Sequence, residues 1–275
     1  MTELELMWLA SNVYNSSGIN SLPKPNGWTE IAYSPDYNFS GFSAGAYKNG
    51  NQIVISYTGT NDKVDWLYGN SAATGLLPSQ QVYEAMRFFL DIKAANPGAT
   101  FSFTGHSLGG GLASLMAVFF DKPATVFDEA PFQLTALNPI ILSALELSLL
   151  AGGYTDLEFA TYNLSLGALF PSRESNVNHI YLEGEILAPV RFAFPTISAS
   201  DTTISMGDSN LSALNRHSMV LLTAMQANED FATLIRELPN FGTFLIDSNW
   251  FGNDSRSSAP DLLRTLLNGQ YLICM

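Results

Sequence analysis

A serine lies between two glycines at the junction of two differently patterned segments of this chain. The stretch FSFTGHSLGG places Ser107 between Gly105 and Gly109. The alternating residues before it predict a strand over 100–105, and the apolar run LGGGLASLMAVFF predicts a helix over 108–120. A turn this sharp strains its central residue and leaves no room for side chains two positions to either side, a clash that glycine removes. The pattern therefore predicts a nucleophile elbow with Ser107 at its tip.

The hydrophobic periodicity of the remaining chain predicts an α/β fold. Strands are predicted over 51–62, 124–131 and 178–187, a helix over 79–98, and a loop entering a helix over 215–225. With the elbow segments, these give the order strand, helix, strand, helix, strand. That order indicates right-handed crossovers and a mostly parallel sheet with helices on both faces. No long Pro-, Ser- or Gly-rich linker divides the chain, so residues 1–275 are expected to form one domain.

The net charge of the chain indicates which kinds of molecule it is not expected to bind. Charged residues make up 13% of the chain and the formal net charge is −13. A nucleic-acid partner is not expected, because phosphate binding needs a basic face. The same charge disfavours electrostatic docking on anionic lipid but leaves transient hydrophobic contact with a membrane or micelle surface open.

The N-terminal segment and the apolar runs bear on location. The N-terminus lacks a basic region followed by an apolar one, so a secretory signal is not predicted. No run reaches the roughly 18 apolar residues of a membrane span. The expected location is therefore the cytoplasm or, through export by a route without such a signal, outside the cell.

The base for a nucleophilic serine can be chosen by elimination, because the chain holds three histidines and histidine is the natural base near neutral pH. His106 adjoins Ser107 and is expected to point away from it by strand alternation, as a packing or supporting residue. His179 opens a predicted strand, which favours a structural role. His217, in LNRHSMVLL, lies at a loop-to-helix junction where an α/β-hydrolase carries its base. We therefore predict His217 as the general base.

The acid that orients the base is expected between Ser107 and His217 in the chain. The candidates are Asp128, Glu129, Asp156, Glu183, Glu185, Asp201 and Asp208. The position sought is the carboxyl end of a strand, where the crevice of a parallel sheet opens. Glu185 fits best, because the preceding run IYL is strand-like and Gly184 lets the chain turn. Asp201 and Asp208, which we expect in a polar loop, are the alternatives.

The segments SYTGTND, TGHSLGGGLAS and HSM together resemble class 3 (fungal-type) lipases, and especially a bacterial branch of lipase and phospholipase domains. The resemblance extends from about Asn12 to residue 222. It implies an α/β-hydrolase fold, with Thr60 of SYTGT and the backbone N–H of Leu108 forming the oxyanion hole. The family carries its acid as Asp in a segment like NDIVP, which EGEILAP matches with Glu185 in that place. Thr58 stands where the family usually has Arg, so a buried ion pair behind the strand is not expected here.

Two segments are candidates for an apolar cover. Family lids follow the oxyanion strand, which implies a lid over residues 65–80. Its candidate substrate-facing residues are Trp66, Tyr68, Leu76 and Leu77. Ordinary packing is the alternative for these side chains. Residues 132–176 are apolar at mixed spacing, and they are expected either to pack as helices over the sheet or to form a mobile apolar cap.

These features favour a serine ester hydrolase acting on lipid acyl esters, similar to a lipase or a phospholipase A. No Gly-rich phosphate loop and no Cys/His cluster occurs in the sequence, so neither a metal nor an organic cofactor is expected. A soluble short-chain esterase or thioesterase is the alternative within the enzyme class. A non-catalytic hydrolase-fold module that only binds is the alternative from another class.

Overall fold

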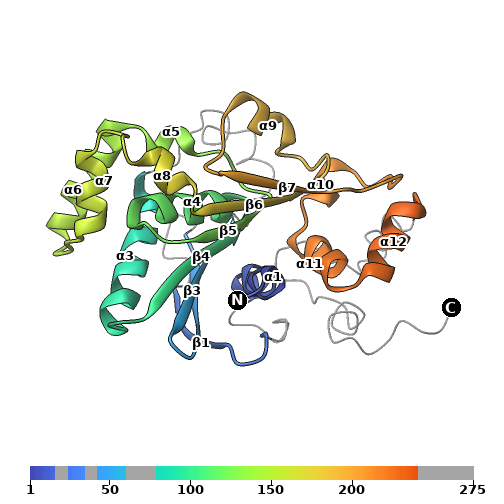
Figure 1. The fold of residues 1–275 in the computed structure, drawn as a ribbon, viewed down its shortest axis with the longest axis horizontal. Helices are drawn as coiled ribbons and strands as arrows, with labels where there is room; N and C mark the ends of the chain where they lie inside the picture. The colour runs from blue at the N-terminus through green and yellow to red at the C-terminus, as the bar shows by residue number, and fades with distance from the viewer. Residues whose placement is uncertain (16–23, 35–41, 60–78, 241–275) are drawn as a thin grey trace.

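The computed structural model describes residues 1–15, 24–34, 42–59 and 79–240. In this part of the chain the strands form one sheet in the order β1-β2-β3-β4-β5-β6-β7 (Figure 1). The strands are β1 (Thr29–Ser34), β2 (Ala44–Asn49), β3 (Gln52–Tyr57), β4 (Thr100–His106), β5 (Ala124–Phe127), β6 (Val177–Leu182) and β7 (Ser200–Ile204). Strands β1 to β3 are antiparallel neighbours, and β3 to β7 run parallel. The predicted α/β class with a mostly parallel sheet is therefore confirmed.

The antiparallel edge of the sheet was not predicted from the sequence. Asn49 of β2 pairs with Gln52 of β3 across a two-residue turn, and Gly50 in that turn has a φ of 59°. Glycine adopts this left-handed backbone conformation at little cost, which makes it the usual residue in such hairpins.

The strands predicted over 51–62, 124–131 and 178–187 are longer than the observed β3, β5 and β6, and β7 was not predicted. The strand predicted over 178–187 stops at Leu182, because the chain turns at Gly184, whose φ is 70°. Asp201 lies in β7 and not in the predicted polar loop. Strand β7 is exposed along most of its length, so it lacks the alternation that marks a half-buried strand, and only its pairing with β6 defines it.

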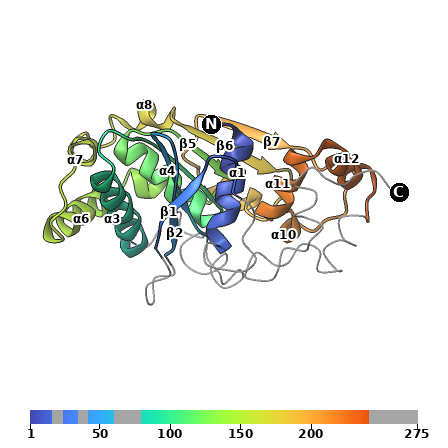
Figure 2. The ribbon, with the colours of Figure 1, turned by 90° about the horizontal axis from the view of Figure 1, so that it is seen from below.

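Helices cover both faces of the sheet (Figures 1 and 2). The helices are α1 (Glu3–Asn12), η1 (Val13–Asn15), α3 (Ser79–Ala95), α4 (Leu108–Phe120), α5 (Gln133–Ala136), α6 (Pro139–Ala151), α7 (Leu157–Leu164), α8 (Phe170–Glu174), α9 (Ala188–Ala193), α10 (Ala213–Arg216), α11 (Met219–Ala227) and α12 (Glu229–Glu237). Ile53 and Ile55 of β3 face the core beneath α3 and α4, whereas Val54 between them faces the core that α1 and α11 close. This alternation is the expected consequence of a two-residue side-chain period.

Residues 132–176 form helices α5 to α8, which pack against α3 and α4. Helix α6 begins where Asn138 accepts hydrogen bonds from the N–H groups of the first turn and Pro139 occupies the first helical position. Leu145 and Phe159 join the core beneath α4. The sequence left two alternatives for residues 132–176, helices packed over the sheet or a mobile apolar cap. The structure shows packed helices, and a capping function of this segment stays a prediction.

Among the helices of the described residues, none has both the length and the apolar character that crossing a bilayer requires.

Helix α4 runs unusually close to the sheet at its first turn. All of its residues are buried. A methyl group at Gly109 would lie 2.1 Å from the carbonyl oxygen of Tyr57, and one at Gly105 would lie 2.3 Å from the carbonyl oxygen of Gly109. These distances are far inside van der Waals contact and involve backbone atoms that belong to the sheet or the helix. Both glycines are therefore required by the approach of α4 to β3 and β4.

We expect Gly109→Ala to lower the free energy of unfolding by about 3 kcal/mol or more, because the added methyl must push helix and strand apart. Gly110→Ala is the matched control, since the nearest atom to its methyl would be the Cα of Glu129 at 3.2 Å. Alanine also favours a helix over glycine by about 1 kcal/mol. Denaturant unfolding of the three proteins measures the difference, and equal losses in the two variants would contradict the close approach.

Candidate active site

The turn at Ser107 has the backbone geometry of a nucleophile elbow. Strand β4 ends at His106, helix α4 begins at Leu108, and Ser107 between them has φ 59° and ψ −125°. The N–H of Ser107 donates to the carbonyl of Phe127 at 3.0 Å, and its own carbonyl accepts from the N–H of Ala130 at 3.0 Å. A strained residue of this kind persists only where its surroundings hold it. Here the neighbouring strand β5 and the segment that follows it hold Ser107.

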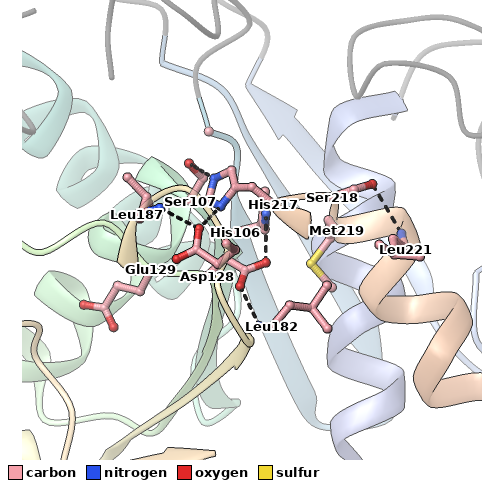
Figure 3. A network of polar contacts seen from close by, with 12 residues as sticks. His106, Ser107, Asp128, Glu129, Leu182, Leu187, His217, Ser218, Met219 and Leu221 are labelled. Atoms are coloured by element: carbon pink, nitrogen blue, oxygen red, sulfur yellow. Dashed lines mark hydrogen bonds and ion pairs between the residues drawn. The ribbon is translucent and has the colours of Figure 1, made fainter. Parts of the chain in front are cut away.

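His217 approaches Ser107 from the loop between α10 and α11 (Figure 3). Its Nε2 lies 2.8 Å from the hydroxyl oxygen of Ser107, and its Nδ1 lies 2.6 Å from the Oε2 oxygen of Glu185. His217 and Glu185 are buried, with 8% and 1% of their surfaces exposed, whereas Ser107 is partly exposed. The structure therefore brings the predicted nucleophile, base and acid into one hydrogen-bonded chain.

Arg216 fixes the loop that carries His217. Its guanidinium and Nε donate to three backbone carbonyls, those of Ser209, Leu211 and Glu183. The Glu183 carbonyl belongs to the turn that carries Glu185, so a single side chain ties the two segments together.

Glu185 sits in a turn directly after β6 and uses both carboxylate oxygens. Oε2 accepts from the N–H of Leu187 at 2.8 Å as well as from His217, while Oε1 forms an ion pair with Arg191 of α9. Arg191 also donates to the carbonyl of Glu129, and its guanidinium lies 4.8 Å from the centre of the Tyr181 ring. Sequence reasoning missed Arg191. The signal available was a basic residue in the helix that follows the acid.

The two alternative acids lie elsewhere. Asp201 contacts His179 at 3.3 Å, and this hydrogen bond is the main cause that lowers the pKa of Asp201. Asp208 is exposed in the turn that follows β7. Neither carboxylate hydrogen-bonds to His217, and Glu185 does.

The predicted oxyanion hole and lid are only partly described. Leu108 is the first residue of α4, where backbone N–H groups have no partner within the helix. Thr60 lies outside the described residues, as do the candidate lid residues Trp66, Tyr68, Leu76 and Leu77 and most of the segment 65–80. The roles assigned to them stay predictions.

The strand that leads to Thr60 is anchored without an arginine. Thr58 donates to the carbonyl of Ser43 both from its hydroxyl, at 2.9 Å, and from its N–H, at 3.0 Å. The N–H of Gly59 donates to the hydroxyl of Tyr14 at 2.8 Å. Hydrogen bonds to a neighbouring strand and to the N-terminal segment thus hold this end of β3.

His106 and Asp128 form a second polar layer behind His217, which sequence reasoning did not predict (Figure 3). The rings of His106 and His217 lie 4.6 Å apart, and Nε2 of His106 lies 3.5 Å from Oδ2 of Asp128. His106 therefore lies beside His217, and its expected supporting role stays a prediction. Two acidic residues directly after a buried strand, in VFDEAP, were the available signal.

The two acidic neighbours Asp128 and Glu129 are both fully buried, but their pKa values shift in opposite directions. Burial alone would raise the pKa of Asp128. A hydrogen bond with His106, the nearby charges of His217 and His106, and the N–H of Leu182 outweigh it and lower that pKa. Burial raises the pKa of Glu129 well above its usual value, although the N–H of Ile197 and the hydroxyl of Ser114 oppose the shift. The surroundings thus favour the charged form of Asp128 and the neutral form of Glu129.

The ligand-type atoms of His106, Asp128 and His217 lie within 4.8 Å of one another. Both ring nitrogens of His217 already contact Ser107 and Glu185, so a metal ion here would have to displace one of these hydrogen bonds. We assign no metal centre to these residues.

Residues 6–139 match the model of a Tle-like phospholipase domain. A stretch of 99 residues is 40% identical to the extracellular phospholipase A1 of Serratia liquefaciens. This match covers 36% of the chain and only 30% of the Serratia protein's length.

Solved structures give a weaker likeness. The Yarrowia lipolytica LIP2 lipase has a TM-score of 0.46 at 15% identity, over 74% of this chain and 77% of that one. The Rhizomucor miehei lipase in its propeptide complex has a TM-score of 0.44 at 16% identity, over 70% of this chain and 64% of that one. Overlaps at this level bear on neither activity nor substrate.

Proposed function

We propose that this chain is a serine ester hydrolase acting on lipid acyl esters, with phospholipid as the substrate class. The match of residues 6–139 to a Tle-like phospholipase domain and the similarity of a 99-residue stretch to a phospholipase A1 support the proposal. The observation that carries the proposal is the contact of Ser107 Oγ with His217 Nε2 at 2.8 Å, with Glu185 behind His217 at 2.6 Å. A binding module without catalysis would have no use for a strained serine held against a buried imidazole.

The chemistry follows from the direction of the hydrogen bonds. Glu185 accepts from Nδ1–H of His217, which leaves Nε2 as the acceptor for the proton of Ser107. As the Ser107 oxygen attacks the ester carbonyl, His217 becomes an imidazolium, which the carboxylate of Glu185 stabilises. The N–H of Leu108 and Thr60 are proposed to hold the oxyanion, and one such donor typically contributes about 3 kcal/mol to the transition state.

The second half of the reaction returns the proton. His217 gives it to the departing alcohol, which leaves an acyl ester on Ser107. A water molecule, deprotonated by His217, then attacks this acyl-enzyme, and His217 returns that proton to the Ser107 oxygen as the fatty acid leaves. The buried ion pair between Arg191 and Glu185 supports both halves, because Arg191 binds the Oε1 oxygen and leaves Oε2 to His217.

We expect vesicles of phosphatidylcholine to yield free fatty acid and lysophospholipid when incubated with the protein, and Ser107→Ala to abolish both products. Triolein emulsion is the parallel substrate. Fatty acid from triolein alone would replace the phospholipid assignment by that of an acylglycerol lipase. Hydrolysis of short-chain p-nitrophenyl esters only, without response to micelles, would favour a soluble esterase or thioesterase.

Catalytic competence can be tested without choosing a lipid. An organofluorophosphonate is expected to add one adduct to the chain, because Ser107 is activated by His217. Intact-mass measurement detects the adduct, which should be absent from Ser107→Ala and present in Ser114→Ala, a buried serine of α4 away from the elbow. A wild-type chain that stays unlabelled would support the binding-module alternative.

Glu185→Gln should leave the fold intact but lower kcat by about 10³- to 10⁴-fold, since the amide no longer stabilises the imidazolium or selects its tautomer. Asp201→Asn and Asp208→Asn are the matched controls and are expected to retain near wild-type kcat. Circular dichroism confirms folding, and turnover of a soluble ester gives kcat. A comparable loss in either control, with Glu185→Gln active, would move the acid to that residue.

A further inference from the structure

Behind His217 lies a buried carboxylate that the reaction scheme does not use. We propose that Asp128 and His106 form a positioning pair for His217, in which the Asp128 charge stabilises the imidazolium that His217 forms while His106 keeps Asp128 ionised. The inference rests on the proposed function, since it concerns the proton that His217 takes from Ser107.

Asp128 is held in place by the ends of two strands. It follows β5 directly, with a φ of 44°, and its N–H donates to the carbonyl of Ile180 at 3.0 Å. One carboxylate oxygen, Oδ1, accepts from the N–H of Leu182 at 3.0 Å. None of the residue is exposed. The other oxygen, Oδ2, is therefore presented in a fixed direction, toward the His106 ring.

The hydrogen bonds around His106 allow a tautomer with the proton on Nε2. The hydroxyl of Tyr14 accepts from the N–H of Gly59 at 2.8 Å and lies 3.3 Å from Nδ1 of His106 and 3.4 Å from the His106 carbonyl. When the Tyr14 hydroxyl donates to Nδ1, Nε2 carries the hydrogen that faces Oδ2 of Asp128 at 3.5 Å. A hydrogen-bond donor next to Asp128 favours its ionised form.

That charge lies close to His217. One ring nitrogen each of His106 and His217 and one carboxylate oxygen of Asp128 lie within 4.8 Å of one another. The centroids of the two histidine rings are 4.6 Å apart. An opposite charge at about 4 to 6 Å favours the charged form of a titrating group by about one to three pH units. The lowered pKa of Asp128 and the raised pKa of Glu129 agree with this arrangement, because of these two neighbours only Asp128 faces His106.

Two carboxylates of the described residues, Glu185 and Asp128, act on His217 in different ways. Glu185, after β6, touches the ring and is in turn paired with Arg191 of α9. Asp128, after β5, acts across the His106 ring of β4. Loss of Glu185 changes both the tautomer and the charge at His217, whereas loss of Asp128 changes the charge alone. The two carboxylates should therefore be separable by the pH dependence of the reaction.

The test is the rate of fluorophosphonate labelling of Ser107 between pH 4.5 and 9, because the deprotonated fraction of His217 sets its acidic limb. In Asp128→Asn, which retains an oxygen for the Leu182 N–H, we expect this limb to move to lower pH by about one unit. The plateau rate is expected to fall about tenfold, since one pH unit of lost imidazolium stabilisation corresponds to a factor of ten. Asp201→Asn, which alters the equivalent acid–histidine contact on the neighbouring strand pair, should keep the wild-type limb.

Further variants separate charge from structure. His106→Gln keeps an N–H donor toward Asp128 and should keep the wild-type limb, whereas His106→Leu removes the donor and should shift the limb as Asp128→Asn does. If Asp128→Asn does not fold, as judged by its thermal transition, the His106 pair decides. An unmoved limb in folded Asp128→Asn, or in His106→Leu, overturns the inference while labelling of Ser107 upholds the proposed function. A wild-type chain without labelling ends both.

Discussion

The approach of helix α4 to the end of strand β3 is the contact on which the rest of the site depends. Tyr57 and Gly109 meet backbone to backbone, at a distance that leaves no space for a side chain. Only with the helix this close can the chain turn within one residue from β4 into α4, and only that turn presents Ser107 outside the sheet. The energy stored in the backbone of Ser107 is balanced by hydrogen bonds to Phe127 and Ala130 on the neighbouring segment. Packing therefore holds Ser107, the proposed nucleophile, in a conformation that it would not adopt alone.

Three buried acidic residues, Asp128, Glu129 and Glu185, lie at the carboxyl edge of the parallel sheet. Each has different neighbours. Glu185 is matched by Arg191, and Asp128 by His106. Burial raises the pKa of Glu129 well above its usual value, which favours its neutral form. A chain with a net charge of −13 thus buries three acids at one edge of its sheet, each in different surroundings. The partners come from different elements, since His106 lies in β4 and Arg191 in α9.

Much of this site can be predicted from the sequence where the signal is local. The elbow glycines surround their serine within five residues, His217 follows by elimination among three histidines, and Glu185 is marked by the adjacent Gly184. The antiparallel edge strands, β7, Arg191 and the layer formed by Tyr14, His106 and Asp128 were not found. Their roles depend on which segments meet in space, and no residue spacing records that Tyr14 lies under Gly59 or that β7 completes the sheet edge. Thr60 and the lid residues remain expectations, because they fall outside the described part of the chain.

Arg216 gives the arrangement one more property. Its partly exposed side chain donates to carbonyls of the segment before His217 and of the turn that carries Glu185. The proposed base and acid therefore share one anchor, whereas Ser107 is held by β5 and the residues that follow it. Heating that breaks the hydrogen bonds of Arg216 would abolish activity while the strands are still paired. Activity should therefore be lost at a lower temperature than the one at which the protein unfolds.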